Sequence, residues 1–502
     1  MTEISPATAD VPDSSDRTAR RHGFRHWTAQ EAAVAIVPAL FLAALLMFAH
    51  PMMIFDSDPL MHIGIGQWMI AHGAVPRSDP FSYTFLGQPW NAHEWLSQIL
   101  IAEAYRLGGM SGLSVVFGLA CAATAFFLAV TLLRFLPPIP ALIMLIFPLA
   151  FLGPVVQARP HILALPILVF WTGELLAARQ EQRAPVWILI PLMVLWANLH
   201  GSFFLGLCLL AVFAFEAAIA AKQKWPEALR SWGIIAVGAT LAAFATPTML
   251  SGFLFPLKMT ALPGLTSIGE WQSPIFQGFN LLEVCLFGAL LFCLTRGVRV
   301  PPIRLLLLLG LLHEGLQHRR HTLILVSLGA MLLAEPIAAT LKAKSVAPPS
   351  SLRLYRGAAV AALSFLLFIS AARLAIPKPL ADESLSPVAA IAHVPDSIVQ
   401  QPVFNQQEIA GYLIFKGIRP FIDARFELYG DVFESNYFRI IRGGDRPAFE
   451  KTLAKYGVVW TVLQPGGPAN AILDELPGWR ILYQDKFAVV HVRSDIGSTA
   501  GN

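Results

Sequence analysis

The 502-residue chain has few charged residues and a correspondingly large apolar share. Charged side chains make up 14% of the sequence and hydrophobic ones 56%, whereas soluble proteins are roughly 45–50% apolar. The mean hydropathy is +0.60. These values exclude an ordinary soluble protein and indicate a protein with many membrane spans.

Cysteine is scarce as well. Cys121, Cys208, Cys285 and Cys293 all lie inside apolar runs, where a thiol behaves as a small hydrophobic group. Neither a disulfide framework nor a cysteine metal cluster is therefore expected. The formal net charge of +4 is small for this length and gives no support to a nucleic-acid partner.

Long apolar runs dominate the first three quarters of the chain. The first run, 32–50, is long and leads into bulky residues, so it predicts a membrane span and not a cleavable signal peptide. Ten further runs follow at 111–133, 138–157, 161–178, 186–200, 202–221, 231–248, 279–296, 301–317, 321–340 and 357–376. We therefore expect a mainly α polytopic membrane protein with about 11 transmembrane helices, followed by a soluble C-terminal α/β domain.

Composition divides the chain into three parts. Residues 1–31 predict a disordered basic tail, 32–376 a transmembrane domain whose first outer loop is 51–110, and 377–502 an α/β domain. Within that loop, the segment 95–107 carries Glu103 and Arg106 and predicts an amphipathic helix at the membrane interface. In the C-terminal part we expect strands at 403–405, 412–415, 420–423, 458–463 and 487–492, and a helix at 445–456.

The basic residues orient the spans. If the N-terminus is cytoplasmic, most clusters of lysine and arginine fall on the cytoplasmic side, and an odd number of spans places the C-terminal domain outside. The same alternation places four polar segments on the outer face with the first loop: 159–161, 198–200, 270–271 and 318–321. The unusual polar residues are thus expected to converge on one face of the membrane.

The first outer loop carries the densest acid–base chemistry. The stretch 55–95 holds Asp56, Asp58, His62, Asp79, His93 and Glu94. A carboxylate at a membrane surface can act as a general base on an acceptor hydroxyl, while nearby basic groups stabilise a departing phosphate. A pair of aspartates is common in loops, however, and Asp58 before Pro59 equally suits the cap of a helix.

The other outer residues also have structural alternatives. Arg159 with His161 can anchor a helix end, and Asn198 and His200 can satisfy hydrogen bonds between helices. Arg319 and Arg320 oppose the charge rule, which a phosphate-bearing ligand explains because guanidinium groups bind phosphate bidentately; the alternative is that the span boundaries differ there.

One further polar cluster lies in the C-terminal part. It comprises Asp423, Arg425, Glu427, Tyr429 and Asp431. A solvated edge with internal ion pairs is the favoured interpretation over a second site.

Several motifs together resemble a known family. They are Asp56-Ser57-Asp58 with His62, the run GAVPRSDPFSYT at 73–84, GQPW at 87–90 with HEWL at 93–96, RPH at 159–161, WANLHG at 196–201 and FIDAR at 421–425. With the span layout, they resemble the GT-C superfamily of membrane glycosyltransferases that use polyprenyl-phosphate sugars, in a bacterial subgroup. The 73–96 pattern is the specific part of this resemblance.

The resemblance implies an inverting hexosyl- or pentosyltransferase of the bacterial inner (plasma) membrane. Its donor would be a polyprenyl-phosphate sugar, and its acceptor a glycan, lipid or protein of the envelope on the periplasmic face. Asp56 would be the catalytic base, with Asp58 as alternative or partner. No cofactor is expected, although a divalent cation at Asp56 and Asp58 stays open.

The remaining roles are inferred from topology and charge. His93 and Glu94 would position the acceptor, and Arg159, His161, Arg319 and Arg320 would face the lipid phosphate. His62, Asn198, His200 and Glu270 complete the expected substrate-binding set. Two rival functions remain, a transporter or flippase for lipid-linked glycans and a noncatalytic assembly component; clustering at one face disfavours the transporter, whose charges should line mid-span positions.

Overall fold

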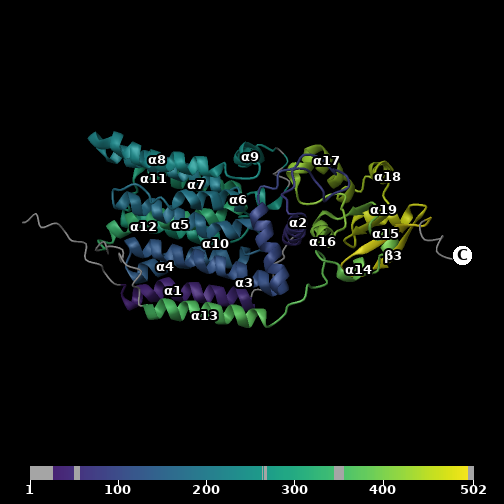
Figure 1. Cartoon of the computed structure of the whole chain (residues 1–502), viewed down its shortest axis with the longest axis horizontal. Coiled ribbons are helices and arrows are strands. Elements are labelled where there is room, and N and C mark those ends of the chain that lie inside the picture. Colours follow the sequence, from purple (N-terminus) through teal and green to yellow (C-terminus); the bar gives the residue numbers. More distant parts are fainter. Residues whose placement is uncertain (1–26, 50–56, 263, 265–267, 344–355, 496–502) are drawn as a thin grey trace, which may run out of the picture.

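A helical bundle occupies one end of the molecule and a small α/β unit the other, with the helices α2 (Asp58–His72) and α16 (Ala410–Phe415) between them (Figure 1). In this computed structural model, the described residues are 27–49, 57–262, 264, 268–343 and 356–495. Of the predicted disordered tail 1–31, residues 1–26 lie outside them, and the end of the tail is wrong because a helix begins at Ala29 with Thr28 as its N-cap.

Each of the eleven predicted apolar runs contains a helix. The helices of this part are α1 (Ala29–Ala44, continued by the π-helical Leu45–Ala49), α3 (Trp95–Phe135), α4 (Pro138–Val155), α5 (Pro160–Gln180), α6 (Leu189–Leu199), α7 (Phe203–Ala220), α8 (Trp225–Ala243), α9 (Leu250–Thr260), α10 (Leu281–Arg296), α11 (Pro302–Gln317), α12 (Thr322–Thr340) and α13 (Arg356–Leu374). Within the described residues, six helical segments are long and apolar enough to cross a membrane: Ala29–Ala49, Trp95–Phe135, Pro160–Gln180, Phe203–Ala220, Arg319–Thr340 and Gly357–Leu374. The count of eleven spans stays a prediction for the shorter helices.

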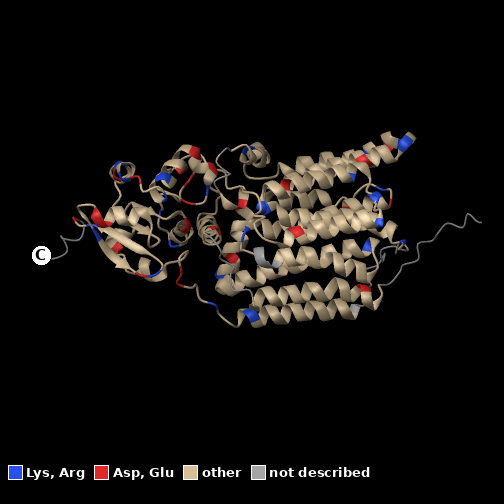
Figure 2. Cartoon of the chain, turned by 180° about the vertical axis from the view of Figure 1, so that it is seen from behind, with Lys and Arg blue, Asp and Glu red and all other residues tan. Residues whose placement is uncertain are grey.

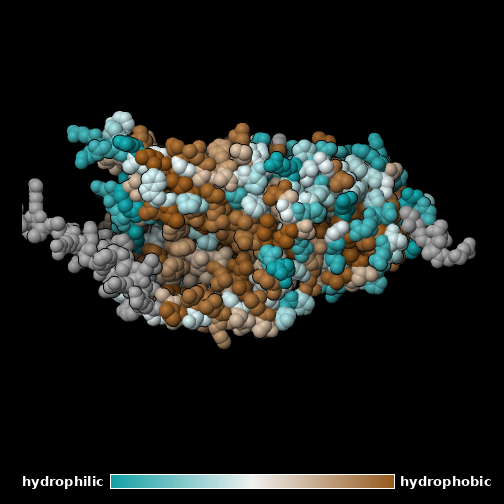
Figure 3. Space-filling view, in the orientation of Figure 1, coloured by the Kyte–Doolittle hydropathy of each residue, from teal (hydrophilic) through white to brown (hydrophobic). Residues whose placement is uncertain are grey.

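The outer surface of the bundle is apolar. On α10, Leu290, Leu291 and Leu294 are 56%, 65% and 72% exposed, and an apolar belt covers this part of the molecule (Figure 3). Acidic and basic residues gather toward the two ends of the bundle and over the α/β unit (Figure 2). A large exposed apolar surface is unfavourable in water, so this distribution suits a bundle immersed in lipid.

The helix α3 is interrupted near its start. Gly108 and Gly109 leave the helical conformation, and Gly109 has a φ of +56°, which favours glycine. A side chain on Gly112 would lie 1.9 Å from the carbonyl oxygen of Ala104, so the two segments approach closely at the kink. The sequence prediction that 95–107 is separate from the following span is confirmed; its place at the membrane interface stays a prediction.

The C-terminal unit combines short helices with one sheet. Its elements are α14 (Val388–Ala392), α15 (Asp396–Val399), β1 (Val403–Asn405), α16, α17 (Phe426–Ile441), α18 (Arg446–Lys455), β2 (Trp460–Leu463), α19 (Pro468–Glu475), β3 (Trp479–Gln484) and β4 (Val489–Arg493). The strand order is β1-β2-β4-β3, with β1 parallel to β2 and the other pairs antiparallel. The expected mainly α architecture with a C-terminal α/β domain is confirmed.

Three of the five predicted strands are correct. They correspond to β1, β2 and β4, and α18 confirms the predicted helix. The predicted strand 412–415 is wrong because these residues form α16, and the predicted strand 420–423 is irregular. Short apolar runs do not distinguish a strand from a buried helix, and this run is apolar because α16 packs into the core.

Close backbone contacts fix α16 against α2. A side chain on Gly411 would lie 1.8 Å from the carbonyl oxygen of Ser57, and one on Gly64 would lie 2.9 Å from the side chain of Ile414. Only glycine permits this approach. The start of α2, including Asp58, is therefore held by the α/β unit.

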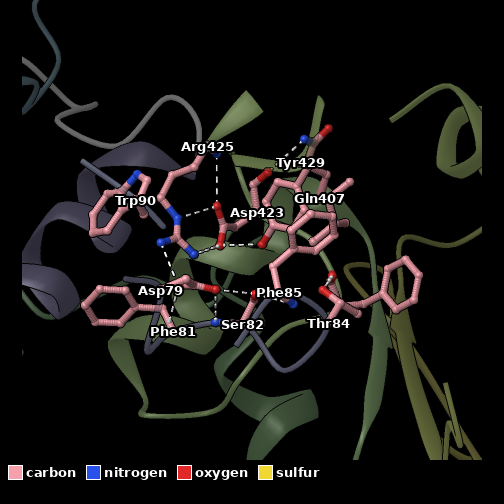
Figure 4. Close-up of polar contacts among 12 residues, drawn as sticks. Asp79, Phe81, Ser82, Thr84, Phe85, Trp90, Gln407, Asp423, Arg425 and Tyr429 are labelled. Atoms are coloured by element: carbon pink, nitrogen blue, oxygen red, sulfur yellow. Dashed lines mark hydrogen bonds and ion pairs between the residues drawn. The ribbon is translucent and has the colours of Figure 1, made fainter. Parts of the chain in front are cut away.

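A buried ion-pair network ties the loop 73–94 to the same unit (Figure 4). The guanidinium of Arg425 donates to Asp79 Oδ1 at 2.8 Å and to Asp423 Oδ2 at 2.6 Å, and Tyr429 donates to Asp423 Oδ2 at 2.8 Å. Asp79 is 1% exposed, Asp423 0% and Arg425 3%. The rings of Phe81 and Trp90 flank the guanidinium.

The predicted solvated edge at 423–431 is therefore wrong. Its ion pairs are internal, as expected, but they are buried because the loop 73–94 covers them. Glu427 accepts a hydrogen bond from Trp90 Nε1 at 3.0 Å, and Asp431 accepts one from the backbone of Gly264 at 3.0 Å. In the sequence alone, a charged segment at the surface cannot be distinguished from one whose ion pairs are buried by a distant loop.

Arg425→Met should lower the free energy of unfolding by about 3–5 kcal/mol, because it leaves two carboxylates buried without their cation. The matched change Arg439→Met removes an ion pair with Asp445 whose arginine is 58% exposed, and should cost under about 1 kcal/mol. Chemical denaturation of the purified proteins measures both. Equal effects of the two substitutions would contradict the structural role of Arg425.

Candidate substrate site at the polar end of the bundle

Four charged side chains from four elements meet where the bundle faces the α/β unit. Asp58 is the first residue of α2, Arg159 precedes α5, Glu270 lies in a short helical turn (Gly269–Trp271), and Arg320 lies in another (Arg319–His321). Arg159 contacts Asp58 Oδ2 at 2.9 Å and Glu270 Oε2 at 2.6 Å, while Arg320 contacts Glu270 Oε1 at 3.1 Å. The structure thus joins four of the predicted site residues into one chain of ion pairs.

Glu270 lies between the two arginines in this series of ion pairs and contacts both of them. Burial alone would raise its pKa, but the positive charges of Arg320 and Arg159 outweigh burial and lower the pKa of Glu270 to about 2. Arg320 also lies over the ring of Trp271, with its guanidinium carbon 4.5 Å from the ring centre. Two arginines are therefore held in fixed positions by an ionised carboxylate.

A second group is centred on Glu94, at the end of the first loop. Glu94 Oε1 lies 3.4 Å from His200 Nε2 and 3.6 Å from His93 Nε2. The backbone N–H of Ser202 donates to His200 Nδ1 at 3.1 Å, which leaves the proton of neutral His200 on Nε2, facing Glu94. The ring of His161 lies 6.1 Å from that of His200.

Burial favours the neutral forms of the groups around Glu94 near pH 7. Burial raises the pKa of Glu94 to about 8, against the opposing positive charge of Arg320. Burial lowers the pKa of His93 to about 4 and holds that of His200 well below its usual value. A carboxyl group with a pKa near 8 exchanges its proton near neutral pH, as general acid–base chemistry requires.

His62 and Gln98 connect the two groups through helix packing. His62 is buried on α2, and its Nδ1 lies 3.2 Å from Gln98 Nε2. Burial and the charge of Arg159 lower the pKa of His62 to about 3, so its ring accepts this hydrogen bond in the neutral form. Sequence reasoning missed Gln98, although its position four residues after Glu94 places both on one helix face.

Asn198 has a structural role that the sequence left open. Its Oδ1 accepts from Trp95 Nε1 at 2.7 Å, and its Nδ2 donates to the carbonyl oxygens of Val194 and Ala245, both at 2.8 Å. These bonds join α3, α6 and the end of α8. Both amide protons are thus used within the protein, and a contact of Asn198 with substrate stays a prediction.

A small recess opens beside Glu94. Its lining includes His93, Trp95, Gly201, Thr246 and Phe255. The hydroxyl of Thr246 has no hydrogen-bond partner among the described residues. No pattern in the sequence pointed to Thr246, since a lone threonine after an apolar run carries no signal.

The remaining predicted residues have different outcomes. Asp56 lies outside the described residues. The structure contradicts the capping alternative for Asp58, because Ser57 holds the N-cap position and Asp58 pairs with Arg159. Arg319 is exposed, and its side chain makes no ion pair with a described residue. Among the described residues, no three His, Cys, Asp or Glu side chains are grouped as metal ligands.

Comparison with known proteins gives little further information. No protein-family model matches the chain, and no curated protein matches it. Among solved structures, ArnT from Cupriavidus metallidurans, crystallised with undecaprenyl phosphate, is similar over 94% of this chain and 100% of its own, with 12% sequence identity and a TM-score of 0.44. A likeness this loose carries no argument about the present chain.

The raised pKa of Glu94 makes a spectroscopic prediction. Because the pKa is about 8, Glu94 is protonated at pH 7 and ionises as the pH rises through 8. Infrared difference spectra between wild type and Glu94→Gln should show a protonated-carboxyl band below pH 8 that disappears above it. Glu270→Gln is the control and should remove no such band, since Glu270 is ionised. Absence of this band from the difference spectrum between wild type and Glu94→Gln at pH 6 would show that Glu94 is already ionised there.

Proposed function

We propose that the chain is a membrane glycosyltransferase that moves a sugar from a polyprenyl-phosphate donor to a hydroxyl acceptor of the cell envelope. The observation that carries this proposal is the meeting of Arg159 and Arg320 with a protonatable carboxyl group, Glu94, at one end of an apolar bundle. A lipid phosphate requires an apolar surface for its chain and cations for its headgroup. Both are present at the same end.

The arginines suit the leaving group of such a transfer. As the sugar leaves, charge develops on the phosphate oxygens, and guanidinium groups already in place stabilise that charge without reorganising. Asp58 and Glu270 hold the guanidiniums in position. Arg319, which is exposed beside Arg320, supplies a further cation to the same headgroup.

In the proposed reaction, the acceptor hydroxyl attacks the anomeric carbon. The bond from this carbon to the phosphate oxygen breaks, the bond to the acceptor oxygen forms, and the polyprenyl phosphate leaves with the electron pair. A single displacement inverts the configuration at that carbon. The hydroxyl proton passes to Asp56 or Asp58, and Glu94 with His93 and His200 contacts the hydroxyl groups of the incoming sugar or acceptor.

The proposed setting is a bacterial inner membrane, with the N-terminus cytoplasmic and the polar end periplasmic. No metal is assigned a role in this reaction. The separation of the arginines from the middle of the bundle argues against the transporter alternative, because a transported headgroup requires polar contacts along its path.

The experiment is a transfer assay on the purified chain in lipid, with radiolabelled undecaprenyl-phosphate sugars and a panel of acceptors. Wild type should transfer or hydrolyse the sugar, and Asp56→Asn or Asp58→Asn should reduce the rate at least about 100-fold, the usual size of a general-base contribution. Asp474→Asn, in the C-terminal unit and away from the proposed site, is the matched control and should leave the rate unchanged.

Loss of transfer in one aspartate variant, with donor binding kept, identifies the base. Transfer rates that neither Asp56→Asn nor Asp58→Asn changes would refute the role of an aspartate as general base. Movement of intact donor across the bilayer without turnover would instead establish a flippase.

A further inference from the structure

A buried arginine outside the charged site lies near the end of α13. Arg373 is in the last turn of this helix, and the residue is 7% exposed. The helix α13 packs against α1 and α3, whereas the charged site is built by α2, the residue before α5 and the turns before α10 and α12. The proposed site for the sugar donor therefore does not account for Arg373.

The contacts of Arg373 leave its charge without a counter-ion among the described residues. Its Nη1 donates to the carbonyl oxygen of Ile376 at 3.2 Å, which is the one hydrogen bond of this side chain within the described part of the chain. A carbonyl oxygen satisfies one of the five N–H donors of a guanidinium and does not neutralise its charge. A buried cation is costly unless an anion accompanies it, so this side chain requires a partner of opposite charge.

The guanidinium of Arg373 is also accessible on one side. Its Nε is closed off from the surface and has no acceptor. Its Nη2 likewise has no hydrogen bond to a described residue, but it is not among the atoms closed off from the surface. A ligand can therefore approach the guanidinium from the side of Nη2.

A second cation lies close to Arg373. Lys378, shortly after the end of α13, is half-buried. Burial lowers the pKa of Lys378, and the positive charge of Arg373 lowers it further, while the charge of Glu383 opposes the decrease. The two cations are thus close enough to repel each other. An anion beside Arg373 would relieve this repulsion.

Two close contacts fix the junction between α3 and α13. The first segment of α3 lies across the end of the bundle, and α13 ends beside it (Figure 1). A side chain on Gly108, at the kink of α3, would lie 2.5 Å from Leu374 Cδ2. The hydroxyl of Ser111 donates to the carbonyl oxygen of Ile376 at 2.8 Å, so Ser111 and Arg373 share one acceptor. Arg373 is thereby held at this junction.

The surface of the junction combines apolar side chains with cations. Leu107, Leu374 and Ile376 are all exposed. Arg106, next to Leu107, is exposed as well and pairs with Glu103 at 2.6 Å. Exposed apolar side chains beside cations at the end of a membrane span are typical of the level at which lipid headgroups meet acyl chains.

We propose that the junction of α3 and α13 binds the headgroup of an anionic phospholipid of the surrounding bilayer, with Arg373 as the main contact. Phosphate oxygens accept hydrogen bonds from a guanidinium and neutralise its charge. The acyl chains of the lipid lie along Leu107, Leu374 and Ile376, which a free phosphate would leave uncovered. A zwitterionic headgroup is disfavoured, because its own cation would lie near Arg373 and Lys378. The site requires a membrane and is independent of the proposed transfer reaction.

The test is native mass spectrometry of the full chain in detergent micelles, with phosphatidylglycerol and phosphatidylcholine added separately. Wild type should bind at least one phosphatidylglycerol more tightly than phosphatidylcholine. Arg373→Met should weaken this binding at least tenfold, whereas Arg373→Lys keeps the charge and should keep the preference for phosphatidylglycerol. The control Arg480→Met, at an exposed arginine on β3, should bind as wild type does.

Thermal unfolding of the same proteins separates lipid binding from a folding defect. Without lipid, Arg373→Met should melt at the wild-type temperature or above it, because the substitution removes a cation that is buried without a counter-ion. Added phosphatidylglycerol should raise the Tm of wild type and leave that of Arg373→Met unchanged, since a ligand stabilises only the protein that binds it.

Equal binding of phosphatidylglycerol by wild type and Arg373→Met would overturn the proposal. Equal affinities of wild type for the two phospholipids would contradict the need for a net negative headgroup. Binding of undecaprenyl phosphate that depends on Arg373, without binding of phosphatidylglycerol, would assign the junction to the sugar donor. Inorganic phosphate that raises the Tm of wild type when phosphatidylglycerol does not would show a site for free phosphate instead.

Discussion

The buried guanidinium of Arg425 is the contact on which the rest of the polar end depends. It pairs with Asp423 in its own segment and with Asp79, 346 residues earlier in the chain. A buried cation with two carboxylates tolerates little displacement, because any gap exposes charge to a medium of low dielectric constant. The loop 73–94 is thereby fixed on the α/β unit. Its last residue, Glu94, lies next to His200 at the end of the bundle.

The arrangement separates two electrostatic environments that face one another. Arg159 and Arg320 are neutralised by Asp58 and Glu270, so the ionic group has balanced charge and can be buried beside apolar helices. Around Glu94, burial raises the pKa of the carboxyl group and lowers those of His93 and His200, which favours their neutral forms near pH 7. An anionic headgroup and a hydroxyl nucleophile need these two environments side by side, which is why transfer from a lipid phosphate accounts for the arrangement better than transport does.

The sequence predicted the elements that follow from composition and period. Each of the eleven apolar runs contains a helix of the bundle, although α9 falls in none of them. Charge alternation predicted that 159–161, 198–200, 270 and 318–321 lie at one end, as the contacts show for Arg159, Glu270 and Arg320. The predictions from the sequence failed where contacts between distant segments determine the local structure or the burial of a residue. Residues 412–415 read as a strand because burial against α2 makes them uniformly apolar, and the cluster at 423–431 read as solvated because the covering loop is distant in sequence. The spacing of Gln98 from Glu94 was the one signal that could have identified it. Thr246 carried no signal, since its position matters only after the loop that follows α8 has packed.

The most direct measurement is binding of undecaprenyl phosphate to the purified chain, observed by native mass spectrometry. Wild type should bind the lipid, and Arg320→Gln should weaken binding at least tenfold, which corresponds to about 1.4 kcal/mol. Arg296→Gln, an exposed arginine at the end of α10, should bind as wild type does. Equal binding by all three proteins, or none by wild type, would contradict the assignment of this end of the bundle to a lipid phosphate.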